Sequence, residues 1–454
     1  MNRITLIASA LSLALSSASA LAKVDAAQAA ELGKTLTPIG AEMAGNTDGS
    51  IPAWDGGITQ APAGYKKGQF HPDPYADDPV LATITSANLA EHEAYLTPGV
   101  KEMFAQYPDT FKIKLYPTRR SASYPQFIYD ASIANATQAE LVPSGNGLIG
   151  AAVGVPFPIP QNGLEAIWNH ITRYRGANAE IQRNQAAPTP SGSYTLVETN
   201  EQIKFLYGVP GTDPAVLAKE NLLFYFKQVV TAPSRLAGTA LLVHETMDQS
   251  KKPRQAWTYN TGQRRVRRAP NVAFDTPGTA SDGLRTTDDF DLYNGSPERY
   301  NWTLVGKKEI YIPYNDYKLH SSDLEYDEIV KPGHINMDLV RWEKHRVWVV
   351  EAELKSDVRH LYKTRTYYLD EDSWQIALAD LYDNRDQMYR VGMAHTINYY
   401  DMPLVWTTLE VFYDLNSRRY IAMGLDNQGE VANFDAELSE TDFTSNALRR
   451  SGRR

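Results

Sequence analysis

Apolar and polar residues alternate along most of the chain after residue 193. In residues 348–354, Trp, Val, Ala and Leu occupy every second position, and Glu occupies two of the positions between them. Such alternation places one set of side chains on each face of an extended strand. The pattern predicts strands over residues 194–198, 222–231, 237–245, 255–259, 264–268, 302–314, 345–355, 361–369, 374–382, 387–399, 405–413 and 420–425.

Short polar links join these predicted strands. Asn260–Gln263 and Asp383–Asp386 are typical of them, since both are rich in turn-forming residues. Close connections join antiparallel neighbours, and no helix alternates with the strands as a parallel sheet requires. We therefore expect a mainly β fold of the α+β class, built on a large, strongly curved antiparallel sheet.

The earlier part of the chain has a different pattern. Residues 23–190 are irregular and rich in Pro and Gly, with short helices predicted over 86–96, 98–106 and 163–175. The last of these has the clearest helical period, because apolar residues recur at i, i+3, i+4 and i+7 from Leu164 to Ile171.

These patterns predict one domain over residues 23–440. It comprises the irregular, partly helical part 23–190 and the antiparallel meander 191–440. Residues 441–454 are polar and end in several arginines, so we expect a loose basic tail.

The first residues have the features of a secretory signal. Arg3 precedes an apolar run, Ile4–Leu15, and small residues at 18, 20 and 22 offer cleavage sites. We therefore expect residues 1–22 to be a signal peptide and the mature chain to fold in the periplasm. No later stretch is apolar for long enough to predict a membrane-spanning helix.

The amino-acid composition limits the kinds of chemical site that the chain can form. The chain of 454 residues has no cysteine, which excludes disulfides, zinc–thiolate sites, cysteine nucleophiles and a lipid-modified cysteine anchor. The last exclusion predicts that the protein is not a lipoprotein. A formal net charge of −9 does not favour nucleic acid as a partner.

The motifs of common enzymes are missing or misplaced. Gly145–Gly150 matches a dinucleotide fingerprint, but prolines follow where the helix of such a site would begin. Asp288, Asp289 and Asp291 do not have calcium-loop spacing and predict an ordinary acidic loop. The chain has neither H-E-x-x-H nor G-x-S-x-G. The sequence therefore predicts no catalytic residue, no cofactor and no metal site.

Two features allow both a structural and a functional interpretation. Arg265 and Arg267 alternate onto one face of a predicted strand, where they either protect a sheet edge from aggregation or receive an anionic head group. Trp257, Trp302 and Trp348 lie in predicted strands, where they either fill the core or line an apolar concavity that binds an apolar ligand.

Several segments resemble a bacterial family known as domain of unknown function 1329. The segments that carry the resemblance are Leu36–Glu42, Pro156–Gly176, Pro253–Pro277, Gly306–Asn315, His345–Lys355 and Tyr367–Asp383. The resemblance implies a fold similar to the periplasmic lipoprotein carriers of the Lol system, an unclosed antiparallel half-barrel with helices covering its concave face. It also implies transport of hydrophobic cargo, with an inner-membrane pump of the resistance–nodulation–division type and an outer-membrane protein as partners.

Our leading hypothesis is a non-enzymatic periplasmic carrier for a lipid or other hydrophobic small molecule. The candidate ligand-binding residues are Leu164, Trp168, Ile171, Trp257, Arg265, Arg267, Trp302 and Trp348. One alternative is a periplasmic hydrolase, which predicts ionisable residues converging in a groove. The other is a glycan-binding module, which predicts an exposed row of aromatic side chains.

Overall fold

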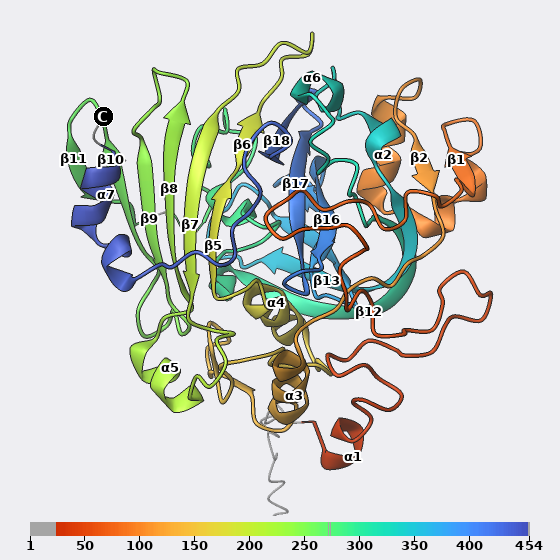
Figure 1. The fold of residues 1–454 in the computed structure, drawn as a ribbon, viewed down its shortest axis with the longest axis horizontal. Coiled ribbons are helices and arrows are strands. Elements are labelled where there is room, and N and C mark those ends of the chain that lie inside the picture. The colour runs from red at the N-terminus through yellow and green to blue at the C-terminus, as the bar shows by residue number, and fades with distance from the viewer. Residues whose placement is uncertain (1–23, 271, 273, 453–454) are drawn as a thin grey trace, which may run out of the picture.

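The computed structural model describes residues 24–270, 272 and 274–452. The predicted signal peptide, residues 1–22, lies outside the described residues. Two sheets form one curved wall, shown in Figure 1. No helix in the described part of the chain is long and apolar enough to cross a membrane.

The larger sheet has ten strands, nine of them in one path and β12 paired with β13 at its side. In spatial order they are β1 (Ala82–Ile84), β2 (Ile113–Leu115), β13 (Trp342–Leu354), β14 (Thr364–Asp370), β15 (Ile376–Tyr382), β16 (Met388–Tyr399), β17 (Leu404–Asp414), β18 (Arg419–Leu425) and β6 (Asn184–Ala186), with β12 at Tyr300–Pro313. From β12 to β18 each strand pairs antiparallel with the next one in sequence. This arrangement confirms the predicted meander.

The smaller sheet has six strands and is also antiparallel. Their order is β11 (Arg265–Arg268), β10 (Gln255–Asn260), β9 (Ala240–Glu245), β8 (Phe224–Ala232), β7 (Glu198–Phe205) and β5 (Asn178–Gln182). A separate hairpin pairs β3 (Glu140–Leu141) with β4 (Leu148–Ile149).

One short stretch of backbone joins the two sheets. β5 pairs with β7 and β6 pairs with β18, and only Arg183 separates β5 from β6. The wall therefore runs without a break from β11 to β12, and these two strands do not pair with each other. The predicted unclosed half-barrel is confirmed.

Helices and turns cover both faces of the wall. The α-helices are α1 (Ala26–Ala29), α2 (Pro98–Gln106), α3 (Gln126–Asn135), α4 (Gly163–Thr172), α5 (Pro214–Glu220), α6 (Tyr326–Ile329) and α7 (Ser445–Ser451). The 3₁₀ turns are Leu89–Glu91, Glu93–Tyr95, Thr287–Asp289, Pro297–Arg299, Met337–Leu339 and Glu440–Phe443.

The inner face is the side on which both sheets share one core. Phe205 and Phe224 from the smaller sheet and Tyr367 and Phe412 from the larger sheet belong to this core, together with side chains of α3 and α4. The outer face of the larger sheet has its own core under α2, and that of the smaller sheet packs against α7. Helices thus cover the concave side, as expected, but they cover the convex side as well.

α4 begins where its sequence predicts. The side chain of Asn162 accepts a hydrogen bond from the backbone N–H of Glu165 and caps the helix. The helix ends at Thr172, before the predicted Arg175, because Arg173 turns to an extended conformation. This early ending lets the side chains of Arg173 and Arg175 reach the same carboxylate on the inner face.

Two local predictions are wrong for identifiable reasons. The strand predicted over 194–198 lies at 198–205, because the buried Glu201 interrupts the apolar alternation that would mark it. The helix predicted over 86–96 consists of two 3₁₀ turns.

The predicted loose tail over 441–454 is also wrong as far as residue 452. Residues 440–443 and α7 fold against the outer face of β9–β11, where Phe443 and Leu448 are buried. The apolar side chains of this segment are few and lie among arginines, so its sequence pattern is that of a solvated tail.

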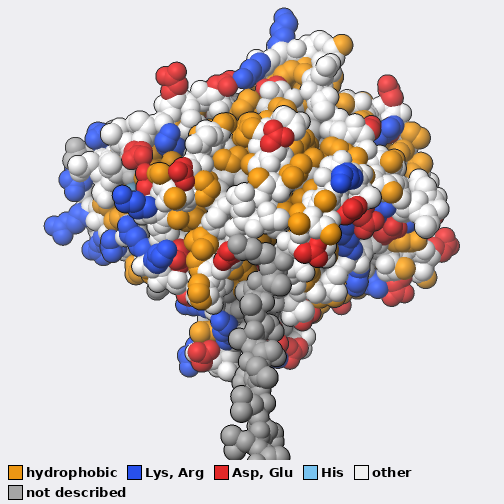
Figure 2. Space-filling model, turned by 90° about the horizontal axis from the view of Figure 1, so that it is seen from below, with side chains coloured by type: hydrophobic (Ala, Val, Ile, Leu, Met, Phe, Trp, Pro, Cys, Tyr) orange, Lys and Arg blue, Asp and Glu red, His pale blue; other side chains and the backbone are white. Residues whose placement is uncertain are grey.

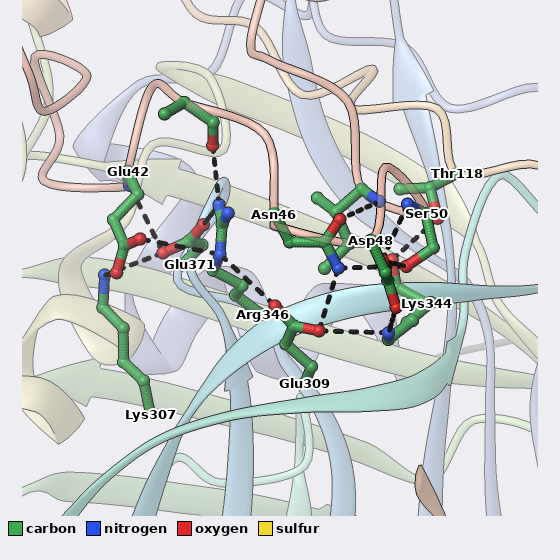
Figure 3. Close-up of polar contacts among 12 residues, drawn as sticks. Glu42, Asn46, Asp48, Ser50, Thr118, Lys307, Glu309, Lys344, Arg346 and Glu371 are labelled. Atoms are coloured by element: carbon green, nitrogen blue, oxygen red, sulfur yellow. Dashed lines mark hydrogen bonds and ion pairs between the residues drawn. The ribbon is translucent and has the colours of Figure 1, made fainter. Parts of the chain in front are cut away.

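Ion pairs fasten the N-terminal segment onto the inner face. Figure 3 shows Glu42 and Asp48 opposite lysines of β12 and β13. Lys307 Nζ lies 3.1 Å from a Glu42 carboxylate oxygen, and Lys344 Nζ lies 2.9 Å from Asp48 Oδ2. The side chain of Arg346, on the same face of β13, donates to the Ala44 carbonyl at 3.0 Å. The N-terminal segment therefore covers part of the concave side that helices leave open.

Candidate functional site

The structure brings together some of the predicted ligand-binding residues. Trp168 and Ile171 of α4 belong to the inner-face core, and Trp302 and Trp348 pack against it from β12 and β13. A Cβ at Gly163 would lie 2.8 Å from the backbone of residues 302 and 303, so α4 lies directly on β12.

These residues form a packed core in this conformation. Trp168 is fully buried, and its indole N–H donates to the Gly145 carbonyl at 3.0 Å. Trp302 stacks on Tyr367, and Trp348 stacks on Trp374. Their role in binding a ligand stays a prediction.

The other predicted residues lie apart from this group. Leu164 is half-buried at the start of α4. Trp257 points to the outer face, where it contacts the ring of His244. Arg265 and Arg267 are exposed on β11, the edge strand of the smaller sheet. Figure 2 shows Lys and Arg side chains gathered at the left edge, on the side where Figure 1 places β11 and α7.

A buried ionic network occupies the inner face next to α4. Asp291 accepts hydrogen bonds from Arg173 at 2.5 Å and from Arg175 at 2.6 Å. The two arginines outweigh the effect of burial and hold the pKa of the Asp291 carboxyl below its usual range. Burial, with the positive charge of Arg173, lowers the pKa of His170 to about 3, so this imidazole is neutral at pH 7.

A second cluster continues the network along the same segment. Asp288 accepts hydrogen bonds from Arg365 at 2.7 Å, and His360 lies 3.0 Å from the same oxygen. Tyr362 donates to Asp289 at 2.9 Å. Asp288, Asp289 and Asp291 are therefore buried, which corrects the prediction of an ordinary acidic loop. Their burial could not be recognised from the sequence pattern, because their arginine partners lie far from them along the chain.

The segment that bears these aspartates closes a small cavity against the smaller sheet. The cavity has a volume of about 50 Å³. Its walls combine six apolar side chains with two arginines and four uncharged polar residues: Phe224, Phe226, Leu241, Val243, Val272, Phe290, Arg254, Arg285, Gln228, Thr279, Thr287 and Asn294. Ligand sites usually measure about 300–1,000 Å³, so a lipid-like ligand requires displacement of the covering segment.

Arg285 is the unusual member of this cavity. Its side chain is buried, and among the described residues no ion pair of its guanidinium is found. Nη1 donates to the Thr286 carbonyl at 3.2 Å, whereas Nε has no hydrogen-bond partner. Burial lowers the pKa of Arg285 in spite of the carboxylates of Glu410 and Asp289. An unpaired buried cation costs several kcal/mol, in the range given for broken buried ion pairs, about 3–5 kcal/mol.

A cross-strand row connects the cavity to the basic edge of the sheet. Strand register places Leu241 opposite Thr258, and Thr258 opposite Arg267. Residues in such a row share one face, and neighbouring strands are about 4.8 Å apart. Arg267 therefore lies on the inner face about 10 Å from the cavity wall, on the same sheet surface.

A larger cleft lies between an N-terminal loop and a C-terminal segment. It has a volume of about 980 Å³ and is lined by residues 65 and 67–71, by Ser322, by Asp401 and Met402, and by 429–435. The ion pair between Lys67 and Asp435 joins its two walls at 2.6 Å.

A chain of hydrogen bonds leads inward from this cleft. His71 Nε2 lies 2.8 Å from Asp401, His71 Nδ1 lies 3.2 Å from His320 Nε2, and His320 Nδ1 lies 2.7 Å from Asp426.

Comparisons with known proteins agree with the sequence resemblance. The profile of a family described as "Protein of unknown function (DUF1329)" matches residues 83–449. An uncharacterized protein of Pseudomonas aeruginosa is 52% identical over 452 residues, which is 99% of each chain.

Several solved structures match more distantly. The structure of a "putative outer membrane lipoprotein-sorting protein domain" from Vibrio parahaemolyticus matches with 15% identity and a TM-score of 0.44. The match covers 63% of this chain and 98% of that one. A DUF1329 protein from Desulfovibrio piger matches with 15% identity and a TM-score of 0.41, over 60% and 92%. A LolA superfamily protein from Nitrosomonas europaea matches with 10% identity and a TM-score of 0.40, over 63% and 100%.

Proposed function

Since this chain belongs to the DUF1329 family of proteins of unknown function, we propose from its own geometry that it is a periplasmic carrier of an amphipathic, lipid-like anion. The observation that supports the proposal most directly is Arg285, a buried guanidinium without an ion-pair partner among the described residues, on the wall of a cavity that it shares with six apolar side chains. A ligand with an acidic head and an apolar body satisfies both features at once.

The two parts of such a ligand gain free energy in different ways. The head forms charge-assisted hydrogen bonds with Arg285, whose Nε is without a partner. The body contacts Phe224, Phe226 and Val243, and burial of apolar surface contributes about 25 cal/mol per Å². A neutral lipid cannot form the charge-assisted hydrogen bonds with Arg285, and a small inorganic anion gains nothing from burial of apolar surface.

Binding requires the covering segment to move, since the closed cavity has only about 50 Å³. The segment is held by the ion pairs of Asp288 and Asp291 and by buried apolar side chains such as Leu292. Its displacement exposes the apolar row on β8 and β9 and connects it with Arg267 at the sheet edge. Arg265 and Arg267 then act as the first contact for an approaching anion.

Export across the inner membrane follows from the predicted signal peptide at residues 1–22. A carrier in the periplasm would exchange cargo with membrane proteins, and the family resemblance makes a resistance–nodulation–division pump and an outer-membrane protein the partners to test first. Neither partner is needed for the binding test.

The test has two parts. Organic extraction of the purified protein, followed by mass spectrometry, is expected to recover an acidic lipid or fatty acid. Displacement of a fluorescent apolar probe by oleate is then compared for the native chain, Arg285→Gln and the exposed control Arg449→Gln. We expect at least a tenfold loss of oleate affinity for Arg285→Gln alone. Absence of any recovered lipid, together with equal displacement by all three proteins, refutes the proposal.

A periplasmic hydrolase is the second candidate, because one observation favours it. The Asp401–His71–His320–Asp426 chain adjoins the cleft of about 980 Å³, where a buried imidazole beside a carboxylate is a candidate general base. Burial lowers the pKa of His71 in spite of its hydrogen bond to Asp401. Turnover of ester or glycoside substrates that is lost in His71→Gln would support this candidate.

The glycan-binding alternative has less support. It predicts an exposed row of aromatic side chains, whereas every Trp and Tyr in the described residues is buried or half-buried.

A further inference from the structure

A compact group of metal-ligating side chains lies at the end of β13, far along the wall from the cavity of Arg285. His345 of β13, Asp370 at the end of β14 and Asp372 in the next turn are all buried. One ligating atom from each lies within 4.8 Å of the others. An imidazole nitrogen with two carboxylates is a donor set that suits divalent transition metals.

Other polar atoms of these side chains already have partners, and Asp372 keeps a bond to Arg120 on each oxygen. His345 Nε2 lies 3.0 Å from Glu343, whose other oxygen accepts from Arg341 at 2.6 Å. Both oxygens of Asp372 accept from Arg120, at 2.6 and 2.8 Å. Supporting carboxylates and guanidinium groups of this kind orient the ligands of metal sites.

Two buried oxygen atoms at the group have no hydrogen-bond partner. Asp370 accepts from Ser373 through Oδ2, but its Oδ1 is buried without a hydrogen bond and lies 3.6 Å from His345 Nδ1. The hydroxyl of Tyr314 is also buried without a partner, and its ring packs at 4.1 Å on the ring of His345. The charges that act most strongly on this phenol are those of Asp370 and Asp372. Buried polar atoms without a hydrogen bond are uncommon in folded proteins, and a bound ion can satisfy them.

We propose that His345 Nδ1, Asp370 Oδ1 and a carboxylate oxygen of Asp372 bind one divalent metal ion of the Zn²⁺ or Mn²⁺ class. Ligands of a tetrahedral Zn²⁺ lie about 3.4 Å apart at about 2.1 Å per bond, so the three side chains, whose ligating atoms lie within 4.8 Å of one another, must move closer together to bind the ion.

The role of this ion is structural. All three ligands are buried, which is typical of a closed site rather than a catalytic one. Arg120 links the site to the N-terminal segment, because its Nη2 also donates to the Glu42 carbonyl at 2.7 Å. The ion would thus tie β13, the turn after β14 and the N-terminal segment into one unit.

The experiment uses the full chain, unfolded in urea and refolded with excess Zn²⁺, with Mn²⁺, or with a chelator, and then desalted. Elemental analysis is expected to find about one metal ion per chain after refolding with metal, together with a melting temperature above that of the chelator sample. Asp370→Asn and His345→Gln are expected to retain less than a tenth of that metal. The control is His395→Gln, which removes a buried histidine paired with Asp316 outside the group and is expected to retain the ion.

Two results overturn the proposal: a native chain that retains no metal and melts at the same temperature in all three samples, or Asp370→Asn that retains as much metal as the native chain. Should both ligand variants fail to fold, the native chain refolded with Co²⁺ gives the answer by itself. A site with this donor set gives visible absorption bands that excess Zn²⁺ abolishes, and a featureless spectrum overturns the proposal. Oleate binding is independent of this outcome, so the carrier function and the metal site fail separately.

Discussion

Arg173 Nη2 lies 2.5 Å from Asp291 Oδ1, and this buried pair joins the end of α4 to the segment that covers the inner face. Asp291 also neutralises Arg175, at 2.6 Å. One carboxylate thus compensates two buried guanidinium groups. These ion pairs fix the covering segment to α4, and Leu292 and Tyr293 of the same segment are buried with α4 in the inner-face core.

Replacing this carboxylate is therefore expected to destabilise the fold strongly. Asp291→Ala leaves Arg173 and Arg175 buried without a counter-ion, and the free energy of unfolding in urea should fall by about 3–5 kcal/mol. The control is Asp386→Ala, which removes an exposed pair with Lys363 and should change stability by less than about 0.5 kcal/mol. Equal effects of the two substitutions would contradict the role given to Asp291.

Movement of the covering segment can be followed directly, because the chain contains no cysteine. Thr279 lines the cavity from this segment, so Thr279→Cys places a single environment-sensitive fluorophore there. Oleate should shift its emission, whereas the same label at Thr441, beside α7, should not respond. A label at residue 279 that stays silent while oleate binds would place the ligand elsewhere.

The stability of the outer face of the larger sheet should depend on pH through Asp380. Burial raises the pKa of this carboxyl to about 6, although Tyr368 donates to it at 3.1 Å and Thr97 at 3.3 Å. The folded state therefore prefers the protonated form. This contribution is complete below about pH 4, where the unfolded carboxyl is also protonated, and it is lost as the pH rises through 6.

Asp380→Asn removes the charge and should stabilise the protein at pH 7.5 by up to about 3 kcal/mol, with little effect near pH 4. Urea unfolding at both pH values measures the difference. A substitution that destabilises the protein equally at both would show that hydrogen-bond geometry, rather than charge, dominates at this position.

The C-terminal segment is expected to be essential for stability. Phe443 stacks on Tyr225 with ring centroids 5.4 Å apart, and Leu448 is fully buried against the outer face of the smaller sheet. Each such side chain contributes about 1.5–3 kcal/mol, so deletion of residues 440–454 should lower the melting temperature by several degrees or more. The exposed pair Arg449→Gln and Arg450→Gln serves as the control. A deletion without thermal effect would restore the picture of a loose tail.

Much of the wall can be predicted from the sequence. Strands such as β16 and β18 follow from apolar alternation bounded by polar turns, and the observed ends differ from the predicted ones by one residue at most. Their antiparallel order follows from the short links. The helical period likewise identifies α2 and the start of α4.

The inner face could not be predicted in the same way. Sequence pattern treats a charged residue as solvated, yet Glu201 and Arg365 lie on strands and are buried because Arg183 and Asp288 compensate their charges. The expected apolar hollow is filled by the protein's own aromatic and aliphatic side chains together with such ion pairs, and the space that remains is a small cavity. Arg285 stands in an irregular segment, where no period indicates which way its side chain points.

The stretch 178–186, shared between the two sheets, also has a consequence for the order of assembly. Its second half pairs with residues 422–425, which are made more than two hundred positions later in synthesis. Until those residues have been synthesised, the earlier strands have no partner on that side, and one edge of the wall stays unpaired. The polypeptide therefore reaches its final form only when almost all of it is available.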